Sequence, residues 1–315
     1  MNCPYGVRRY RVKFRNPLSP PFLKGGAAVH SQTMTPDGWG GIRKTMDRLT
    51  EEKLDRLKEI FQAMGKVLVA FSGGVDSTFL LKVAQDALGD RNVLAVTALS
   101  PLYPDRELAG AKKAAQEMGV RHLLIESNEL EIEGFSENPP NRCYFCKREL
   151  FGELTDLAKK EGVPYVVEGS TLDDEKDHRP GRKAVQELGI RSPLQEAMFT
   201  KGEVRELSKA LDLPTWDKPS FACLASRFPY GEEITPEGLR MVDEAEGFLL
   251  SLGFKQVRVR HYLNLARIEV YPEEISRLMN GSLREKVVNH FKKIGYQYVT
   301  LDLQGFRSGS MNEVL

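Results

Sequence analysis

The sequence predicts an α/β protein in two parts, a Rossmann-like parallel sheet followed by a smaller α+β domain. Three observations predict this fold class. Short apolar runs that fit buried strands alternate with longer segments of helical periodicity over residues 46–218. The first of these runs ends at a glycine turn that leads directly into a helix. Residues 219–315 instead contain strands that alternate polar and apolar side chains, as half-buried strands do.

Length and charge are those of a globular protein with two domains. The 315 residues are 41% hydrophobic and 28% charged. No run approaches 18 apolar residues, so we expect no membrane span and a cytoplasmic location. Of the 45 basic and 44 acidic residues, eight and one fall in residues 1–45, which leaves 37 and 43 for the rest. This mildly acidic remainder argues against a nucleic-acid partner.

Residues 1–45 are predicted to be a basic, disordered tail. They are rich in Pro, Gly and Arg and show no sustained periodicity. The continuous apolar core of a signal peptide is missing from them. We expect the functional start to lie nearer Met34 or Met46. An RNA-binding tail is the alternative.

The first domain, residues 46–218, is predicted from its periodicity. Leu54, Leu57 and Phe61 lie at helical spacing between Asp47 and Met64, and Gly65 ends that helix. The other predicted elements are strands at Val67–Phe71, Val93–Leu99, His122–Ser127 and Tyr165–Glu168, and helices at Thr78–Leu88, Pro104–Met118 and about 144–160. Such an alternation gives a parallel sheet with right-handed crossovers, and ligands bind beyond the carboxyl ends of its strands.

The turn after the first strand is the candidate anion site. It reads SGGVDS, from Ser72 to Ser77. A strand, a glycine turn and a helix start bring several unpaired backbone N–H groups together. The two glycines let the backbone approach a phosphate closely, and the serines can add hydroxyl donors. No lysine stands where a Walker A loop needs one. An ordinary tight turn is the alternative.

This stretch resembles the PP-loop, SGGxDS, of the N-type ATP pyrophosphatases. The resemblance implies an adenine nucleotide alpha hydrolase-like fold and cleavage of ATP between its α and β phosphates. It also implies that the ATP-binding residues are Ser72, Gly73, Gly74, Asp76 and Ser77, with Asp76 near Mg²⁺.

A second strand end carries the sequence EGSTLDD, from Glu168 to Asp174. It resembles the GTNxDD stretch of PP-loop enzymes, with Ser and Leu replacing part of the pattern. The resemblance makes Asp173 a further candidate for nucleotide binding. A solvated helix cap is the alternative for this segment.

Three of the four cysteines have the spacing of a metal site. Cys143 and Cys146 form a CxxC at a predicted helix start and so lie on one helix face, while Cys223 is distant in sequence. No fourth Cys or His accompanies them, as a structural zinc site would need. Three thiolates suit a [4Fe–4S] cluster with one open iron. Two unrelated thiols, or a redox pair, are the alternatives.

The second domain, residues 219–315, follows the proline-rich segment DLPTWDKP. Its predicted elements are helices at Pro236–Leu252, Ile275–Met279 and Leu283–Ile294, and strands at Gln256–His261, Ala266–Tyr271 and Tyr298–Leu303. Alternation places Arg258 and Arg260 on one strand face, where two guanidinium groups suit a phosphate or carboxylates. Glu269 in the next strand could orient them. Exposed strand charges are the alternative.

Two further motifs accompany the cysteines, CLASRFPYG around Cys223 and RVRHYLNLARIEV in the second domain. Together with NRCYFCK they are similar to the LarE family, over the chain from about Met46 to its C-terminus. LarE proteins are ATP-dependent sulfur transferases of nickel-pincer cofactor synthesis. The resemblance implies adenylation of the carboxylates of pyridinium-3,5-biscarboxylic acid mononucleotide and their conversion to thiocarboxylates. Members that have only the cysteine matching Cys223 give up its sulfur, whereas three cysteines are thought to hold a [4Fe–4S] cluster that carries sulfide.

The family also implies roles for single residues. The implied catalytic residues are Asp76, Cys223 and Arg227, where Arg227 places positive charge near the sulfur. The implied substrate residues are Ser226, Arg227, Glu246, Arg258, Arg260 and Glu269, and the implied metal ligands are Cys143, Cys146 and Cys223.

The implied partners are a small nucleotide substrate, a sulfur donor or delivery protein, the other nickel-pincer enzymes and further copies of the chain. Three alternative functions remain at this point. A tRNA thiolase shares the PP-loop and can share a three-cysteine cluster. A PP-loop ligase that uses ammonia, such as NAD or GMP synthetase, would not need the cysteines. A non-catalytic nucleotide-binding protein would not need both motifs intact.

Overall fold

The computed structural model describes residues 39–43, 46–175 and 180–314, and its contacts divide the chain into two units. Among the described residues, unit 1 comprises those up to Leu99 together with Arg106–Ser127 and Arg148–Lys218. Unit 2 comprises Ser100–Asp105, Asn128–Lys147 and Pro219–Leu315. The linear boundary after residue 218 therefore needs correction, because two earlier segments, one of them with the CxxC, belong to unit 2.

The physical cause of this division is a hydrophobic cluster within unit 2. Leu102 and Phe135, from the two early segments, are buried with Leu224 and Phe228 from the later one. Periodicity within each segment could not reveal such a long-range cluster.

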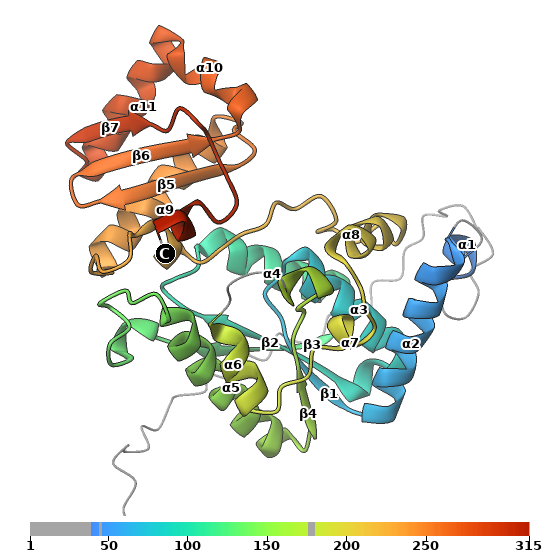
Figure 1. The fold of residues 1–315 in the computed structure, drawn as a ribbon. Coiled ribbons are helices and arrows are strands. Elements are labelled where there is room, and N and C mark those ends of the chain that lie inside the picture. Colours follow the sequence, from blue (N-terminus) through green and yellow to red (C-terminus); the bar gives the residue numbers. More distant parts are fainter. Residues whose placement is uncertain (1–38, 44–45, 176–179, 315) are drawn as a thin grey trace, which may run out of the picture. The chain divides into compact units, whose positions relative to one another are not determined.

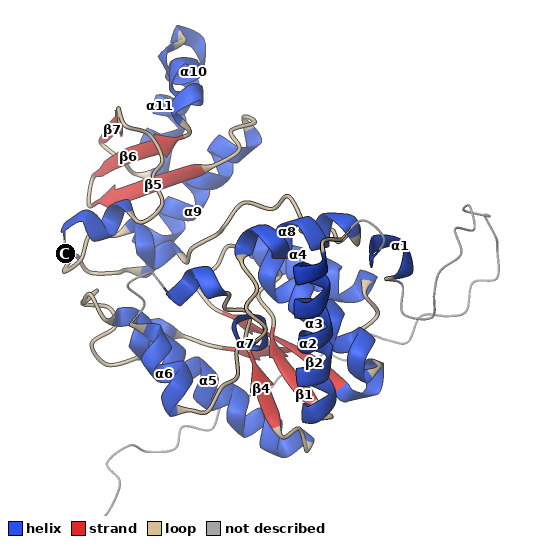
Figure 2. Cartoon of the chain, turned by 45° about the vertical axis from the view of Figure 1, so that its right-hand side comes forward, coloured by secondary structure: helices blue, strands red, loops and turns tan. Residues whose placement is uncertain are grey.

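Unit 1 is built on a parallel sheet with the strand order β3-β2-β1-β4 (Figures 1 and 2). Its strands are β1 (Val67–Ala70), β2 (Val93–Leu99), β3 (Arg121–Glu126) and β4 (Tyr165–Val167). Val67 pairs with both Val93 and Tyr165, so β1 lies in the centre. The predicted α/β class is confirmed, and all four strands direct their carboxyl ends to one edge of the sheet.

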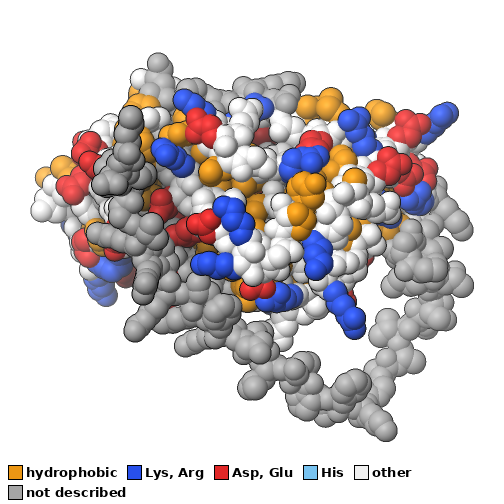
Figure 3. Space-filling model, turned by 90° about the horizontal axis from the view of Figure 1, so that it is seen from below, with side chains coloured by type: hydrophobic (Ala, Val, Ile, Leu, Met, Phe, Trp, Pro, Cys, Tyr) orange, Lys and Arg blue, Asp and Glu red, His pale blue; other side chains and the backbone are white. Residues whose placement is uncertain are grey.

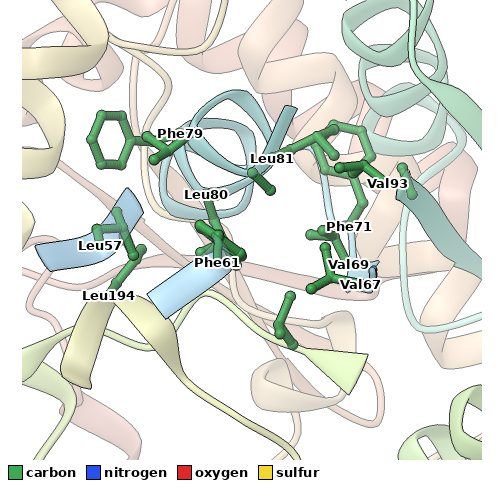
Figure 4. Packing of buried hydrophobic residues seen from close by; sticks show 14 of the residues in the cluster. Leu57, Phe61, Val67, Val69, Phe71, Phe79, Leu80, Leu81, Val93 and Leu194 are labelled. Carbon is green, nitrogen blue, oxygen red and sulfur yellow. The ribbon is translucent and has the colours of Figure 1, made fainter. Parts of the chain in front are cut away.

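Helices cover both faces of this sheet. One face packs against α2 (Arg48–Met64), α3 (Val75–Leu88), α4 (Asp105–Glu117), α7 (Pro193–Glu196) and α8 (Lys201–Ala210), and the other against α5 (Arg142–Glu161) and α6 (Gly181–Glu187). Figure 4 shows Phe61, Leu80 and Leu194 in the core on the first face. Full burial of such a side chain contributes about 1.5–3 kcal/mol, so this core holds the strand ends in place.

The segment 39–43, which was expected to be part of the tail, belongs to the folded part. Trp39 is fully buried and its indole N–H donates to Asp86 at 2.9 Å. Helix α1 (Gly40–Arg43) follows, and Arg43 pairs with Asp55. The remainder of the predicted tail lies outside the described residues.

Unit 2 contains a three-stranded sheet with the order β5-β6-β7 (Figure 1). Its elements are β5 (Val257–Tyr262), β6 (Leu265–Val270), β7 (Tyr298–Leu301), α9 (Pro236–Ser251), α10 (Ile275–Met279) and α11 (Gly281–Ile294). One sheet face, with Val259 and Ile268, packs against the helices. Alternation sends Arg258 and Arg260 to the other face. Among the helices of the described ranges, none combines the length and apolarity that a membrane span requires.

Candidate active site

The SGGVDS turn joins β1 to α3 at the carboxyl edge of the sheet in unit 1. Helix α3 begins at Val75, three residues before the predicted start, so Asp76 and Ser77 lie in its first turn. Gly74 is the N-cap and makes no side-chain capping bond. The first N–H groups of α3 are therefore oriented toward the turn, where a phosphate can accept from them.

Backbone geometry explains both the glycines and the serines. Gly73 has φ = +68°, and a Cβ there would lie 2.7 Å from the Cα of Ala111 on α4. Any side chain at this position would both strain the backbone and clash. The hydroxyls of Ser72 and Ser77 lie 3.0 Å apart, and Ser77 also donates to the Gly74 carbonyl at 3.2 Å. The turn is thus tight and pre-organised.

The loop after β4 packs beside this turn, with Gly169 close to the start of α3. A Cβ on Gly169 would lie 3.1 Å from the Ser77 nitrogen. Glu168 is buried and accepts from the backbone N–H and hydroxyl of Ser170. Asp173 is exposed and accepts from the N–H of Lys201 at 2.6 Å, in the first turn of α8. These contacts favour the helix-cap alternative for Asp173.

The three cysteines all lie in unit 2. Cys143 and Cys146 are one turn apart on α5, Cys143 exposed and Cys146 half-buried. Cys223 is half-buried at the start of the short 3-10 helix η4 (Leu224–Arg227). Cys146 and Cys223 contact the same hydrophobic cluster. The structure therefore brings distant thiols into one neighbourhood.

Burial and neighbouring charges raise the pKa of two of the thiols, Cys146 and Cys223. Burial, then Glu129 and Cys223, raise the pKa of Cys146 well above its usual range. Burial and Cys143 raise the pKa of Cys223, partly offset by Arg142 and Arg227. Glu129, which no sequence motif had marked, is buried with its carboxylate 4.0 Å from the Cys146 sulfur. Within the described ranges, however, no three Cys, His, Asp or Glu side chains come close enough to share a metal ion.

These differences predict an order of cysteine reactivity. Because the thiolate is the nucleophile, exposed Cys143 should be alkylated first, and Cys146 and Cys223 only more slowly or at higher pH. The measurement is timed iodoacetamide labelling of reduced, iron-free protein with peptide mass spectrometry. Cys223 reacting first would contradict the described burial.

Arg227 is a buried side chain that donates hydrogen bonds to the loop of residues 222–226, which contains Cys223. Its side chain is fully buried, and its Nε and Nη2 donate to the two oxygens of Glu246, both at 2.8 Å. Its Nη1 donates to the carbonyls of Ala222 and Cys223 and to the Ser226 hydroxyl. Arg227 therefore fixes the loop through its whole guanidinium group, with Glu246 as its counter-ion.

Arg260 and Arg258 differ in the groups that accept their hydrogen bonds. Arg260 donates to both oxygens of Glu269, at 2.9 and 2.8 Å, and to the Ser226 carbonyl. Arg258 donates to the carbonyls of Val257 and Ser220. Burial, then the charge of Arg227, lowers the pKa of Arg258 to about 10. Arg258 forms no direct ion pair within the described ranges, although the charges of Glu246 and Glu269 act against the lowering of its pKa. The alternative of exposed strand charges is wrong, because Arg258 and Arg260 are both buried.

The Arg227–Glu246 pair predicts a large stability effect. Arg227→Met leaves the Glu246 carboxylate buried without its counter-ion and should cost about 3–5 kcal/mol. The exposed pair Arg240–Glu237 is a matched control, where solvent screens both charges and Arg240→Met should change stability very little. Urea unfolding compares the two variants. An equal loss of unfolding free energy in the two variants would contradict a stabilising role of the buried pair.

The same pair predicts a pH effect. Burial, the largest single influence, raises the pKa of Glu246, but the charge and hydrogen bonds of Arg227, the charge of Arg258 and the N–H of Val259 together outweigh it and lower the pKa below its usual 4.5. The charge of Glu246 therefore stabilises the fold above pH 4.5, and this stability is lost as pH falls through the lowered value. Urea unfolding of the wild type and Glu246→Gln over this acid range measures the effect. An identical pH dependence in the two proteins would contradict it.

Comparisons with known proteins agree with this geometry. The family model described as NAD synthase matches residues 49–138. An uncharacterised protein of Synechocystis is 48% identical over 267 residues, 85% of this chain and 99% of that protein. The pyridinium-3,5-bisthiocarboxylic acid mononucleotide synthase of Lactiplantibacillus plantarum is 42% identical over 250 residues, 79% of this chain and 90% of the relative. An uncharacterised protein of Methanocaldococcus jannaschii is 32% identical over 254 residues, 81% of this chain and 95% of the relative.

In the parallel sheet of unit 1, the inner strand β1 is followed by the SGGVDS turn and then by helix α3. This arrangement defines the PP-loop class of ATP-using enzymes. Within that class, the chain belongs to the LarE family of pyridinium-3,5-bisthiocarboxylic acid mononucleotide synthases. This family consists of ATP-dependent sulfurtransferases, and the chain is an enzyme of that kind.

Proposed function

We propose that the chain adenylates the two carboxylates of pyridinium-3,5-biscarboxylic acid mononucleotide and converts them to thiocarboxylates for the nickel-pincer cofactor. The observation that carries the proposal is Arg258. Its guanidinium is buried, forms no direct ion pair with a carboxylate of the described residues, and donates to the carbonyl of Ser220, three residues before Cys223. A buried cation of this kind suits an anionic substrate.

The reaction has two steps in each round. A substrate carboxylate oxygen attacks the α-phosphorus of ATP, and pyrophosphate leaves with the electron pair of the broken bond. A sulfur nucleophile then attacks the acyl carbon, and AMP leaves. Ser72–Ser77 would bind the phosphates through the first N–H groups of α3, with Asp76 beside Mg²⁺. Positioned donors of this kind stabilise the charge that develops on the leaving group.

The sulfur carrier is proposed to be a [4Fe–4S] cluster held by Cys143, Cys146 and Cys223. The donor chemistry fits, because Cys143 contributes to the raised pKa of both Cys146 and Cys223, although Cys223 lies in a distant segment. In the described residues no three donors form a group that could hold a metal ion, so cluster binding would need these side chains to rearrange, and Cys143 is exposed. When bound, the cluster would supply sulfide at its open iron.

Arg227 would serve the same step by positioning. Its hydrogen bonds to the carbonyls of Ala222 and Cys223 fix the backbone that carries the Cys223 thiol. Its charge also lowers the pKa of that thiol against the effect of burial. Glu246 and Glu269 would act through Arg227 and Arg260, and Ser226 would link the two arginines.

A tRNA thiolase is the rival that shares most of these features. Figure 3 shows one face of the molecule, on which basic and acidic side chains are interspersed. Such a face does not offer the continuous basic surface that tRNA phosphates need. The sulfur donor, the other cofactor enzymes and a homo-oligomeric state remain proposals that follow from the family.

Titration of the variant Arg258→Ala tests the substrate assignment. Loss of one charge-assisted contact should weaken binding of the pyridinium mononucleotide about tenfold to a hundredfold, with ATP binding unchanged. Arg258→Lys should not restore it, since lysine lacks the planar fork. Arg240→Ala, at the exposed pair with Glu237, is the control. Equal weakening for both ligands would assign Arg258 to ATP, and no weakening would make it purely structural.

A further inference from the structure

The SGGVDS turn contains no lysine, but the structure brings one to it from 145 residues away. The Nζ of Lys218 lies 3.0 Å from the carbonyl oxygen of Gly73. The same ammonium lies 2.8 Å from the Oε2 of Glu107 on α4, and both side chains are largely buried. A positive charge is therefore present at the turn.

The backbone around Lys218 is fixed in place. Arg205, on α8, donates to the carbonyls of Trp216 and Lys218, both at 3.0 Å. The N–H of Lys218 donates to the Thr215 carbonyl at 3.0 Å. Only the long side chain is left to move, so the ammonium can reach different acceptors while its backbone stays at the turn.

Glu107 gives this ammonium a counter-ion that a phosphate can replace. It lies on α4, one turn before Ala111, the residue that packs against Gly73. In the structure the charges of Lys218 and Glu107 compensate each other. A polyphosphate carries several negative charges, so it competes effectively with one carboxylate for the ammonium.

We infer that Lys218 is the phosphate-binding cation of this turn, held by Glu107 and the Gly73 carbonyl until the β and γ phosphates of ATP arrive. The inference rests on the PP-loop half of the proposed function. When the α-phosphorus–oxygen bond breaks, its electron pair goes to pyrophosphate, and Lys218 stabilises that charge without giving up its proton. AMP contains neither the β nor the γ phosphate, so it makes no contact with Lys218.

The test compares pyrophosphate with AMP as ligands of Lys218→Met, by calorimetry with Mg²⁺ present. Pyrophosphate should bind about tenfold to a hundredfold more weakly than to the wild type, with AMP affinity unchanged. Glu107→Gln removes the competing carboxylate and should raise pyrophosphate affinity, whereas a lower affinity would contradict the competition. Lys53→Met is the matched control, because Lys53 forms a similarly buried pair with Glu203 at 2.6 Å. It should change neither affinity.

Unchanged pyrophosphate affinity in Lys218→Met would overturn the inference. Equal loss of pyrophosphate and AMP, with a melting temperature well below that of Lys53→Met, would also overturn it, by showing that Lys218 only supports the turn. Neither ligand contains the pyridinium or the sulfur, so failure of the proposed substrate or sulfur carrier leaves this test unaffected.

Discussion

Replacing Asp76 by Asn, or Ser77 by Ala, is expected to abolish ATP-dependent pyrophosphate release while the fold survives. Both residues lie in the first turn of α3, where under the proposed function a metal ligand and a hydroxyl donor would act on the phosphates in the transition state. Loss of one such group typically costs about a hundredfold to a thousandfold in rate. The measurement is pyrophosphate release with the pyridinium substrate, ATP and Mg²⁺.

The control for both variants is Thr78→Val in the same helix. Its hydroxyl donates to the Gly74 carbonyl within the protein, so its loss should affect stability more than the chemical step. Circular dichroism establishes that each variant is folded. Wild-type turnover in folded Asp76→Asn and Ser77→Ala would show that the turn does not bind the phosphates of ATP.

Replacing any one of Cys143, Cys146 and Cys223 by Ser is expected to remove most of the iron and nearly all sulfur transfer. A serine hydroxyl is a poor ligand and a poor nucleophile in place of a thiolate. Adenylation should persist, because the ATP-binding turn lies in unit 1 and the cysteines lie in unit 2. Iron and sulfide counts on anaerobically purified protein, with pyrophosphate and thiocarboxylate assays, measure the three properties separately.

Two outcomes would contradict the cluster proposal. The first is an iron-free enzyme that turns over many times. The second is a product-linked loss of one sulfur from Cys223, with Cys143→Ser and Cys146→Ser fully active. That result would mean that Cys223 is consumed as the sulfur source.

The geometry of the SGGVDS turn was predictable because its determinants are local. A strand, two glycines and a helix start follow one another in sequence, and Gly73 does adopt the left-handed conformation that excludes other residues. Helix α8 also carries a local signal, the capping box from Thr200 to Glu203, from which its start could have been predicted. Lys218 carries none, since only the folded chain places it against Gly73.

The arginines show that sequence periodicity predicts the strand face of a side chain but not its partner. Alternation correctly placed Arg258 and Arg260 on one strand face, but it could not tell an ion pair from an anion site. The structure pairs Arg227 with Glu246 and Arg260 with Glu269, whereas Arg258 donates to backbone carbonyls. Such differences arise from side chains that are distant in sequence, so no local pattern contains them.

The central claim is that this chain exchanges oxygen for sulfur on a pyridinium dicarboxylate at the expense of ATP. The most direct measurement is mass spectrometry of the pyridinium mononucleotide after anaerobic incubation with cluster-loaded enzyme, ATP, Mg²⁺ and sulfide. The account predicts two successive replacements of oxygen by sulfur, each with one AMP and one pyrophosphate formed. Pyrophosphate release without sulfur in the product, or an amide formed when ammonia is supplied instead, would contradict it.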